Sequence, residues 1–392
     1  MTTTLLPDIL STPEAAALRD TLRSFLAEVL PWERVRELDG QDSFPRDVWQ
    51  GLGQLGVLGL GIPEEHGGSE GTVTDAVVAC IELARVYPSL AVDYVLCGMV
   101  ARMLADHGTP QQQERWLPGL AAGERIYAYG ISEPDGGTDA LALRTRARAT
   151  DGGFEVSGSK LWISLAGEAD EIFTLVRTEE PDPPERRARG LSVLAVPTDQ
   201  GAVKIHRIHL AGMRGAGTCE VVFDGALTDA DCLVGPRGRG FHMLRDTLNV
   251  ERRLSAGISI GIGAAALEHA VGYAAEREAF GRPIGGFQAI QHGLVDAATS
   301  LAGGMLLTDH AVQQLASGRD ATAASGMAKL AVAEATAQVV DRGMRVLGGM
   351  GLAREVPMQL WFRDARLQLF SPVSNEMIRN LLGEAMGLPR SY

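Results

Sequence analysis

Apolar positions recur every three and four residues through the first third of the chain. Ser11 or Thr12 can cap a helix, and apolar side chains then follow at helical spacing until Pro31. A glycine-rich loop at residues 59–68 interrupts the pattern. The same period predicts further helices over residues 47–58, 73–86, 91–107 and 110–117. Residues 1–123 are therefore expected to form a helical N-terminal domain.

Near residue 121 the period changes to two, which is typical of strands. Gly, Asp and Pro break the alternating segments, and a charged, proline-rich run at 181–189 is expected to be the tip of a surface hairpin. The predicted strands cover residues 127–132, 145–149, 153–158, 160–164, 172–177, 191–196, 203–208 and 218–223. Residues 124–236 are therefore expected to form a middle β-barrel or sandwich domain.

Longer helical patterns return from Gly238. They cover residues 240–277, 287–316 and 321–347, with a last stretch that ends near Met386. We expect residues 237–392 to form a C-terminal four-helix bundle. Helices followed by strands and again by helices predict an α+β fold, not an alternating α/β fold.

Composition and charge narrow the class of protein. The chain has 392 residues, of which 45% are hydrophobic and 22% charged, so it can bury two or three cores. A net charge of −13 without a block of basic residues argues against nucleic acid and anionic membrane as partners. The N-terminus has no basic segment followed by a long apolar run, and no continuous apolar stretch is long enough to span a membrane. These features predict a cytoplasmic protein.

The cysteines carry no sign of a metal site. Their spacing fits no ligand pattern and the chain has no secretory context, so we expect reduced packing residues and no bound metal. The four are Cys80, Cys97, Cys219 and Cys232.

The stretch from residue 128 to 139 joins a strand to a polar bend. Tyr129 and Ile131 suit a strand, and the following Glu-Pro-Asp-Gly-Gly ends it, which exposes backbone N–H groups and the hydroxyls of Ser132 and Thr138. By itself this stretch is typical of an ordinary hairpin loop.

Further blocks occur downstream in a definite order. They are Gly-Ser-Lys-Leu-Trp-Ile-Ser at 158–164, Phe-Gly-Arg-Pro-Ile-Gly-Gly-Phe-Gln at 280–288, Leu-Gly-Gly-Met-Gly at 347–351 and Arg-Asp-Ala-Arg at 363–366. Together with residues 128–139, these blocks resemble the acyl-CoA dehydrogenase family of flavoenzymes over nearly the whole chain. The resemblance implies the three-domain fold of that family and bound FAD. It leaves the substrate open, because the same scaffold also serves carrier-protein thioester oxidation, nitroalkane oxidation and flavin-dependent N-oxygenation.

The resemblance implies which residues bind FAD. One set matches positions that lie against the flavin ring, and the ring also needs an aromatic or apolar cover and polar donors. These residues are Tyr129, Ile131, Ser132, Gly137 and Thr138, with Trp162 and Ser164 closing over the ring. The alternative for Trp162 is a core tryptophan of the β domain.

A second set matches residues that reach a neighbouring subunit's flavin, its pyrophosphate or its adenosine. Arg345 stands where a glutamine is common in the family, and either side chain can donate to phosphate. The set comprises Arg277, Phe280, Phe287, Gln288, Arg345, Gly348 and Gly349; Ser374 and Glu376 match positions that approach the flavin. The resemblance therefore implies a homo-oligomer, a tetramer or a dimer.

The catalytic base departs from the usual family pattern. An ungapped count from Arg363 places Pro372 where most family members carry a glutamate, and proline can neither accept a proton nor donate a backbone N–H. Glu251 matches the alternative position used by isovaleryl- and long-chain-type enzymes. Its helical neighbours at three, four and seven residues include Leu244, Leu254 and Ile258, so its carboxylate lies on the apolar face. The alternative is a structural ion pair of Glu251 with one of the two arginines that follow it.

Several interpretations of function stay open. The leading hypothesis is FAD-dependent α,β-dehydrogenation of an acyl thioester carried by CoA or an acyl carrier protein, with α-proton abstraction by Glu251 and hydride transfer to flavin N5. An electron-transfer flavoprotein or oxygen would reoxidise the flavin. Thr138, Asn249 and Arg252 match residues beside the substrate. The alternatives are a flavin monooxygenase or oxidase on the same fold and a non-catalytic flavin-binding relative. Small residues such as Gly98, Gly257 and Gly261 either make room for the acyl chain or allow close helix packing.

Overall fold

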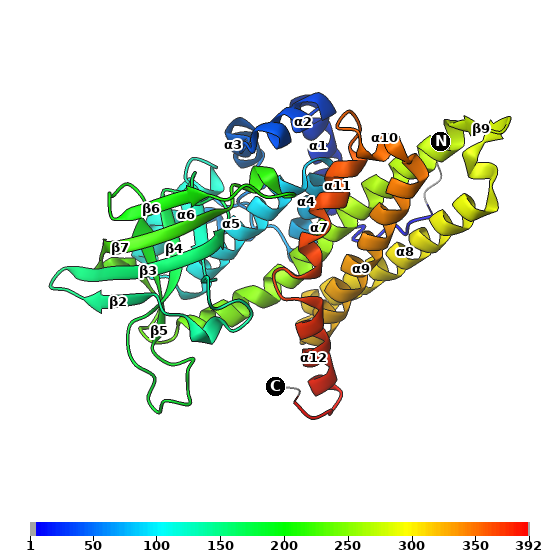
Figure 1. Ribbon diagram of the computed structural model, residues 1–392. Helices are drawn as coiled ribbons and strands as arrows, with labels where there is room; N and C mark the ends of the chain where they lie inside the picture. Colours follow the sequence, from blue (N-terminus) through cyan, green and yellow to red (C-terminus); the bar gives the residue numbers. More distant parts are fainter. Residues whose placement is uncertain (1–4, 391–392) are drawn as a thin grey trace.

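The computed structural model describes residues 5–390, apart from the side chains of Asp246, Leu248 and Asn249. A helical N-terminal region, a β-sheet and a C-terminal helical region follow one another along the chain, and the sheet lies at one end of the helices (Figure 1). The N-terminal helices are α1 (Pro13–Val29), α2 (Trp32–Gln41), α3 (Arg46–Gln54), α4 (Val73–Val86), α5 (Pro88–His107) and α6 (Pro110–Ala121).

The middle region forms one mixed sheet. Its strands are β1 (Tyr127–Gly130), β2 (Arg146–Ala149), β3 (Gly153–Ile163), β4 (Glu171–Arg177), β5 (Leu191–Pro197), β6 (Val203–Arg207), β7 (Cys219–Asp229) and β8 (Leu233–Val234). They pair in the order β6-β7-β3-β2-β4-β5-β8, and β1 runs parallel to β4. The predicted hairpin tip at 181–189 does connect two antiparallel neighbours, β4 and β5.

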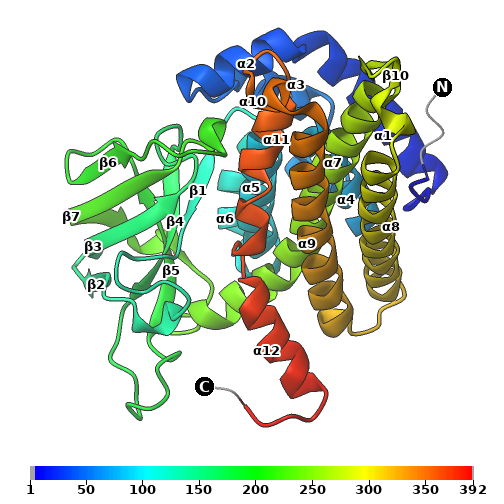
Figure 2. The ribbon, with the colours of Figure 1, turned by 45° about the vertical axis from the view of Figure 1, so that its right-hand side comes forward.

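The C-terminal region is built around one long helix. Helix α7 (Gly240–Glu276) packs against α4 and α5 of the N-terminal region as well as α8 (Gln288–Ala316) and α9 (Thr322–Leu347) (Figure 2). A short hairpin of β9 (Glu278–Ala279) and β10 (Arg282–Pro283) separates α7 from α8. The remaining helices are α10 (Gly349–Leu352), α11 (Met358–Asp364) and α12 (Asn375–Ala385).

The structure differs from the prediction in several places. The helix expected over residues 47–58 ends at Gln54, and the short strands β8, β9 and β10 were not expected. Helix α2 was not expected, because its sequence is strongly polar; burial of Val35 and an ion pair of Asp39 with Arg363 at 2.8 Å stabilise it through contacts distant in sequence. The two strands predicted at 153–158 and 160–164 are a single strand, β3. Gly158 does not break it, because it lies within the pairing with β7, next to a register shift.

Two helices, α5 and α7, are long and apolar enough to cross a membrane. However, 72% and 83% of their most apolar windows are buried inside the protein. They are therefore core helices, whose apolar character is explained by packing on both sides.

Glycines on α7 allow α4 to approach closely. A Cβ on Gly261 would lie 2.3 Å from the carbonyl oxygen of Ile81, and one on Gly257 would lie 3.0 Å from the carbonyl oxygen of Val77. These two glycines serve close packing. Gly98 differs, because a Cβ there would meet no atom within 4 Å.

We expect Gly261→Ala to destabilise the protein by about 1–3 kcal/mol, because the added methyl group forces α7 away from the α4 backbone. Gly272→Ala, in the same helix, is the matched control: its Cβ would meet nothing within 4 Å, and alanine favours the helix by about 0.5–1 kcal/mol. Thermal unfolding of both variants tests this, and an unchanged midpoint for Gly261→Ala would contradict the packing role.

Candidate active site

Helix α7 holds Glu251 at the junction of the sheet with the C-terminal helices. The residue is 9% exposed. Burial raises the pKa of its carboxyl group to about 8, although Arg252 and Lys329 oppose that shift. A carboxyl group with this pKa can exchange a proton near neutral pH.

The two arginines that follow Glu251 differ in their described contacts. Arg253 Nη1 donates to Ser325 Oγ at 3.4 Å, whereas Arg252 is the arginine whose charge lowers the pKa of Glu251. Arg252 is half-buried beside it, and burial lowers the pKa of Arg252 while Glu251 opposes this. The side chain of Asn249, the other predicted substrate contact on α7, lies outside the described residues.

Strand β1 brings Tyr129 close to Glu251. Tyr129 is buried, and its hydroxyl group forms no hydrogen bond of good geometry with the described residues. Burial raises the pKa of this hydroxyl; Thr247 on α7 lowers it, and Glu251 raises it further. A buried hydroxyl without a partner is rare, so Tyr129 has donor capacity left for a ligand.

A buried lysine on α9, which none of the sequence motifs includes, completes the environment of Glu251. The Lys329 ammonium donates to the Val373 carbonyl at 2.9 Å and to Asn375 Oδ1 at 2.8 Å. Burial lowers the pKa of Lys329 to about 8, while Glu376 and Glu251 raise it. A lysine in the apolar run at 326–333 was the sequence signal that could have revealed it.

The segment that contains Pro372 is therefore tied to α9. Ser374, predicted to approach the flavin, is the N-cap of α12, and its Oγ accepts a hydrogen bond from the Met377 amide at 3.2 Å. Glu376 lies in the first turn of α12 with its side chain exposed. Pro372 lies in this segment, at the position where most family members carry the base. Lys329, on α9, therefore links the segment to the surroundings of Glu251.

A second buried lysine shapes the bend after β1. The Lys160 ammonium donates to the Ile131 carbonyl at 3.1 Å and to Glu133 Oε1 at 2.9 Å. Glu133 also accepts hydrogen bonds from the amides of Arg144 and Thr145. Burial would raise the pKa of Glu133, but Lys160 and these donors lower it overall. The ion pair therefore fixes the backbone between Ile131 and the loop that follows, and neither partner was predicted as a site residue.

The polar bend after β1 and the residues predicted to cover the flavin, Trp162 and Ser164, lie next to this backbone. The Ser132 carbonyl accepts a hydrogen bond from the Leu161 amide at 2.9 Å, so the bend lies next to β3. Gly137 has a positive φ of 43°, and Thr138 is exposed. Trp162, on the same strand as Leu161, is 56% exposed with a φ of 64°, which excludes a core tryptophan. Ser164 follows it, with its Oγ 3.4 Å from Thr218 Oγ1.

The second set of predicted FAD residues lies at the other end of the long helices. Glu251 and Arg277 are separated along α7 by about 40 Å, at 1.5 Å per residue. Arg277 and Phe280 belong to the β9–β10 hairpin region, which projects away from the sheet (Figure 1). Arg345 is exposed and pairs with Asp341 at 2.9 Å. Phe287 precedes α8 and Gln288 begins it, while Gly348 and Gly349 follow α9.

Within one chain, the two sets of residues predicted to bind FAD therefore lie far apart. Phe280 is 95% exposed, and the exposed Trp162 lies on the distant sheet. The first set offers the aromatic cover of Trp162, the buried hydroxyl group of Tyr129 and exposed polar loops, which suit a flavin ring. The second set offers the guanidinium group of Arg277, which suits a diphosphate. The residues therefore fit a flavin that is covered from two sides.

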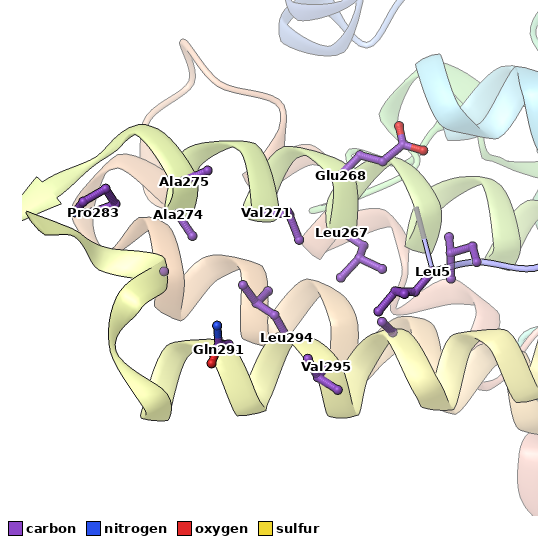
Figure 3. Close-up of a pocket in the computed structure, with 13 residues that line it drawn as sticks. Leu5, Leu267, Glu268, Val271, Ala274, Ala275, Pro283, Gln291, Leu294 and Val295 are labelled. Atoms are coloured by element: carbon purple, nitrogen blue, oxygen red, sulfur yellow. The ribbon is translucent and has the colours of Figure 1, made fainter. Parts of the chain in front are cut away.

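An apolar cavity of about 360 Å³ lies between α7 and α8, near the β9–β10 hairpin and away from Glu251. Figure 3 shows Leu267, Val271 and Ala274 of α7 facing Leu294 and Val295 of α8 across it. This cavity is therefore distinct from the predicted catalytic site.

Comparison with known proteins identifies the family. The model of the acyl-CoA dehydrogenase N-terminal domain matches residues 12–124, that of the middle domain residues 128–226 and that of the C-terminal domain residues 238–387. Acyl-CoA dehydrogenase FadE12 of Mycobacterium tuberculosis is 31% identical over 382 residues, which are 97% of each chain. Isovaleryl-CoA dehydrogenase of Bos taurus is 31% identical over 95% of this chain and 88% of its own. The crystal structure of an acyl-CoA dehydrogenase from Geobacillus kaustophilus superposes with a TM-score of 0.92 at 28% identity, covering 96% of this chain and 99% of that one.

The fold and site define a flavoenzyme, and the chain belongs to the acyl-CoA dehydrogenase family. Members of this family bind FAD and dehydrogenate acyl-CoA, so the resemblance found in the motifs, the fold class and the cofactor are confirmed. The protein is a flavin-dependent oxidoreductase.

We expect Lys329→Met to loosen the segment at 371–376, because the variant loses both hydrogen bonds that hold Val373 and Asn375. Hydrogen exchange followed by mass spectrometry should show faster exchange in peptides covering this segment. Lys204→Met, at an exposed lysine that pairs with Asp224, is the control and should leave them unchanged. Equal exchange in wild type and Lys329→Met would show that other contacts hold the segment.

Proposed function

We propose that this protein desaturates an acyl thioester between its α and β carbons and that Glu251 is the catalytic base. The observation that carries the proposal is a buried carboxyl group with a pKa of about 8, in a chain that has proline at the usual base position. Glu251 matches the position of the base in isovaleryl-type enzymes, and a bovine isovaleryl-CoA dehydrogenase is among the relatives of this chain.

The residues around Glu251 support proton abstraction. Arg252 and Lys329 lower the pKa of Glu251, so its ionised form is accessible, while burial keeps it basic enough to take a weakly acidic α-proton. Bound FAD supplies the oxidant, which takes up a hydride from the β carbon. The α-proton moves to a Glu251 carboxylate oxygen, and the product is an enoyl thioester.

The proposed cofactor site includes both sets of predicted residues. Tyr129, Ser132, Thr138 and Trp162 would contact the flavin ring from the sheet. Because Arg277 lies about 40 Å away along α7, we infer that a second copy of the chain supplies it, in a dimer or a tetramer. Exposed apolar side chains near the hairpin, such as Phe280 and Val295, support this inference. An electron-transfer flavoprotein or oxygen would accept the electrons.

A second candidate function is a flavin oxygenase or oxidase on the same fold. Pro372 favours it, because the segment that usually supplies the base and a backbone N–H supplies neither. An oxygenase would consume oxygen without forming an enoyl thioester, so stoichiometric enoyl product under anaerobic conditions would eliminate it.

We expect a suitable acyl-CoA to bleach the flavin of the wild-type protein anaerobically, and Glu251→Gln to slow bleaching on the order of 10²–10⁴-fold, because the amide cannot accept the proton. Glu268→Gln, at a glutamate farther along α7 that pairs with Arg85, is the matched control and should bleach at the wild-type rate. Equal rates for wild type and Glu251→Gln would remove Glu251 from the role of base.

The pH profile provides an independent check. Because Glu251 must be ionised to accept a proton, the bleaching rate at low substrate concentration should rise as the pH increases through about 8. The positive charge of Lys329 lowers the pKa of Glu251, so Lys329→Met should move this rise to higher pH, while Lys329→Arg should move it less. A rise that stays at the same pH in Lys329→Met would contradict the electrostatic coupling.

A further inference from the structure

The Arg-Asp-Ala-Arg motif that begins at Arg363 contacts a loop of the middle region. Helix α11 ends at Asp364, and the loop joins β6 to β7 over residues 208–218. Arg363 Nη1 donates to the Ala211 carbonyl at 2.6 Å, and Asp364 Oδ1 accepts a hydrogen bond from the Met213 amide at 2.6 Å. The first two residues of the motif therefore hold the loop at two points of its backbone.

Asp364 holds the loop in a conformation that its sequence does not favour. Asp364 is fully buried, and Met213 has a φ of 53°, which residues other than glycine rarely adopt. The loop also approaches α11 closely, because a Cβ on Gly212 would lie 2.9 Å from Asp364 Oδ1. A turn follows, in which the Ala216 amide donates to the Met213 carbonyl at 3.2 Å. The position of Ala216 therefore depends on the contact between Asp364 and Met213.

The far side of this turn holds the segment that carries Trp162. The Ala216 carbonyl accepts a hydrogen bond from the Leu165 amide at 2.9 Å, and Ser164 Oγ lies 3.4 Å from Thr218 Oγ1. Trp162 and Leu165 both have a positive φ, of 64° and 61°, so the backbone of this segment depends on contacts from outside it. Hydrogen bonds therefore connect α11 to the residues predicted to cover the flavin.

Other contacts of the loop are partly open to solvent. Arg214 pairs with Asp42 after the end of α2, and the arginine side chain is 23% exposed. Arg363, which pairs with Asp39, is exposed to the same extent. Water screens such ion pairs, whereas a buried amide that loses its acceptor finds no replacement. Asp364 is therefore harder to replace than either pair.

The carboxyl group of Asp364 can change its charge near neutral pH. Burial raises its pKa to about 7; the Met213 amide and the two nearby arginines oppose this shift, and Asp39 adds to it. The charged and titratable side chains that face it from its own helix and the neighbouring segments are Arg363, Asp39, Arg214 and Tyr87. Its Oδ2 has no hydrogen-bond partner among the described residues. A proton can therefore occupy Oδ2 while Oδ1 still accepts from Met213.

We propose that Asp364 is a positioning residue for the flavin site: through the loop at 208–218 it holds Trp162 in place against the flavin ring. This inference rests on the proposed function, because it takes Trp162 as a cover of the flavin. The hydrogen bonds at Met213 and Ala216 carry the constraint from α11 to the segment of Trp162. Loss of the acceptor at Asp364 should therefore shift Trp162, although neither Trp162 nor the cofactor is altered.

The first test is the visible circular dichroism of the bound flavin, which reports the surroundings of the ring. Asp364→Leu removes the acceptor, so we expect it to change the flavin bands and to weaken FAD binding about tenfold, the equivalent of one hydrogen bond. Asp364→Asn keeps an acceptor and should retain both properties. Unchanged bands in Asp364→Leu would overturn the proposal.

Arg366→Met is the matched control in the same motif. Arg366 donates to the Ala337 carbonyl of α9 at 3.3 Å and not to the loop. This variant should leave the flavin bands unchanged. If Arg366→Met changes them as much as Asp364→Leu does, the effect comes from general loosening of α11 and the proposal fails.

A double-mutant cycle with Trp162→Leu tests whether Asp364 acts through the tryptophan. Trp162→Leu alone should change the same flavin bands. Asp364→Leu should then add little in the Trp162→Leu background, because the side chain that it displaces is already gone. Fully additive changes would show that Asp364 acts on the flavin by another route and would overturn the proposal. An unchanged spectrum for Trp162→Leu would refute the flavin cover and the inference with it.

The pH dependence provides a test that holds even if Asp364→Leu does not fold. Above about pH 7 the carboxyl group is ionised, and an ionised acceptor binds the Met213 amide more strongly. The flavin bands of wild type should therefore change as the pH rises through about 7, and Asp364→Asn should abolish this change. A flat profile for wild type, or the same change in Asp364→Asn, would contradict the coupling.

Anaerobic bleaching by acyl-CoA separates failure of this inference from failure of the dehydrogenase function. If wild type bleaches and Asp364→Leu leaves the flavin bands unchanged, the positioning role is refuted and the dehydrogenase stands. If no acyl-CoA bleaches the flavin but the changes caused by Asp364→Leu and Trp162→Leu are not additive, the dehydrogenase is refuted and the positioning role stands.

Discussion

The burial of charge along helix α7 is the constraint on which the catalytic site depends. Glu251, Arg252 and Arg253 follow one another on a helix that packs against neighbours on several sides, so their charges are removed from most of the solvent. Burial alone pushes the pKa of Glu251 upward, and the cations of Arg252 and Lys329 hold it near 8. Burial also lowers the pKa of Lys329 to about 8, so its ammonium group can lose a proton near neutral pH. The electrostatic balance of the site is thus set by packing.

Two buried lysines play parallel structural roles on the two sides of the site. Lys160 fixes the bend after β1 through a carbonyl and a carboxylate, and Lys329 fixes the segment before α12 through a carbonyl and an amide. In both cases a loop near the site is attached to a regular element by a buried ammonium group. Such contacts place the loop backbone with little freedom, which a site that orients a reaction requires.

The length of α7 has a consequence for assembly. The helix carries Glu251 near the sheet and ends close to the hairpin with Arg277 and Phe280, about 40 Å away. Residues at the two ends cannot contact the same small ligand within one chain. The separation of the exposed aromatic residues Trp162 and Phe280 is the reason for proposing a flavin site shared between two copies.

Much of the architecture follows from the sequence alone. Hydrophobic periodicity predicted α4 with its observed bounds and α7, α8 and α9 to within a residue or two, because long amphipathic patterns are locally determined. Motif spacing predicted the family and the cofactor, and the place of Glu251 on an apolar face predicted its burial.

Tertiary structure alone decided the rest. Helix α2 is polar and forms through contacts such as Asp39 with Arg363; Gly158 continues a strand because β7 pairs with it. The partners of Lys160, Lys329 and Arg253 lie on other elements, and charge balance in a core depends on which elements meet, which local sequence does not encode.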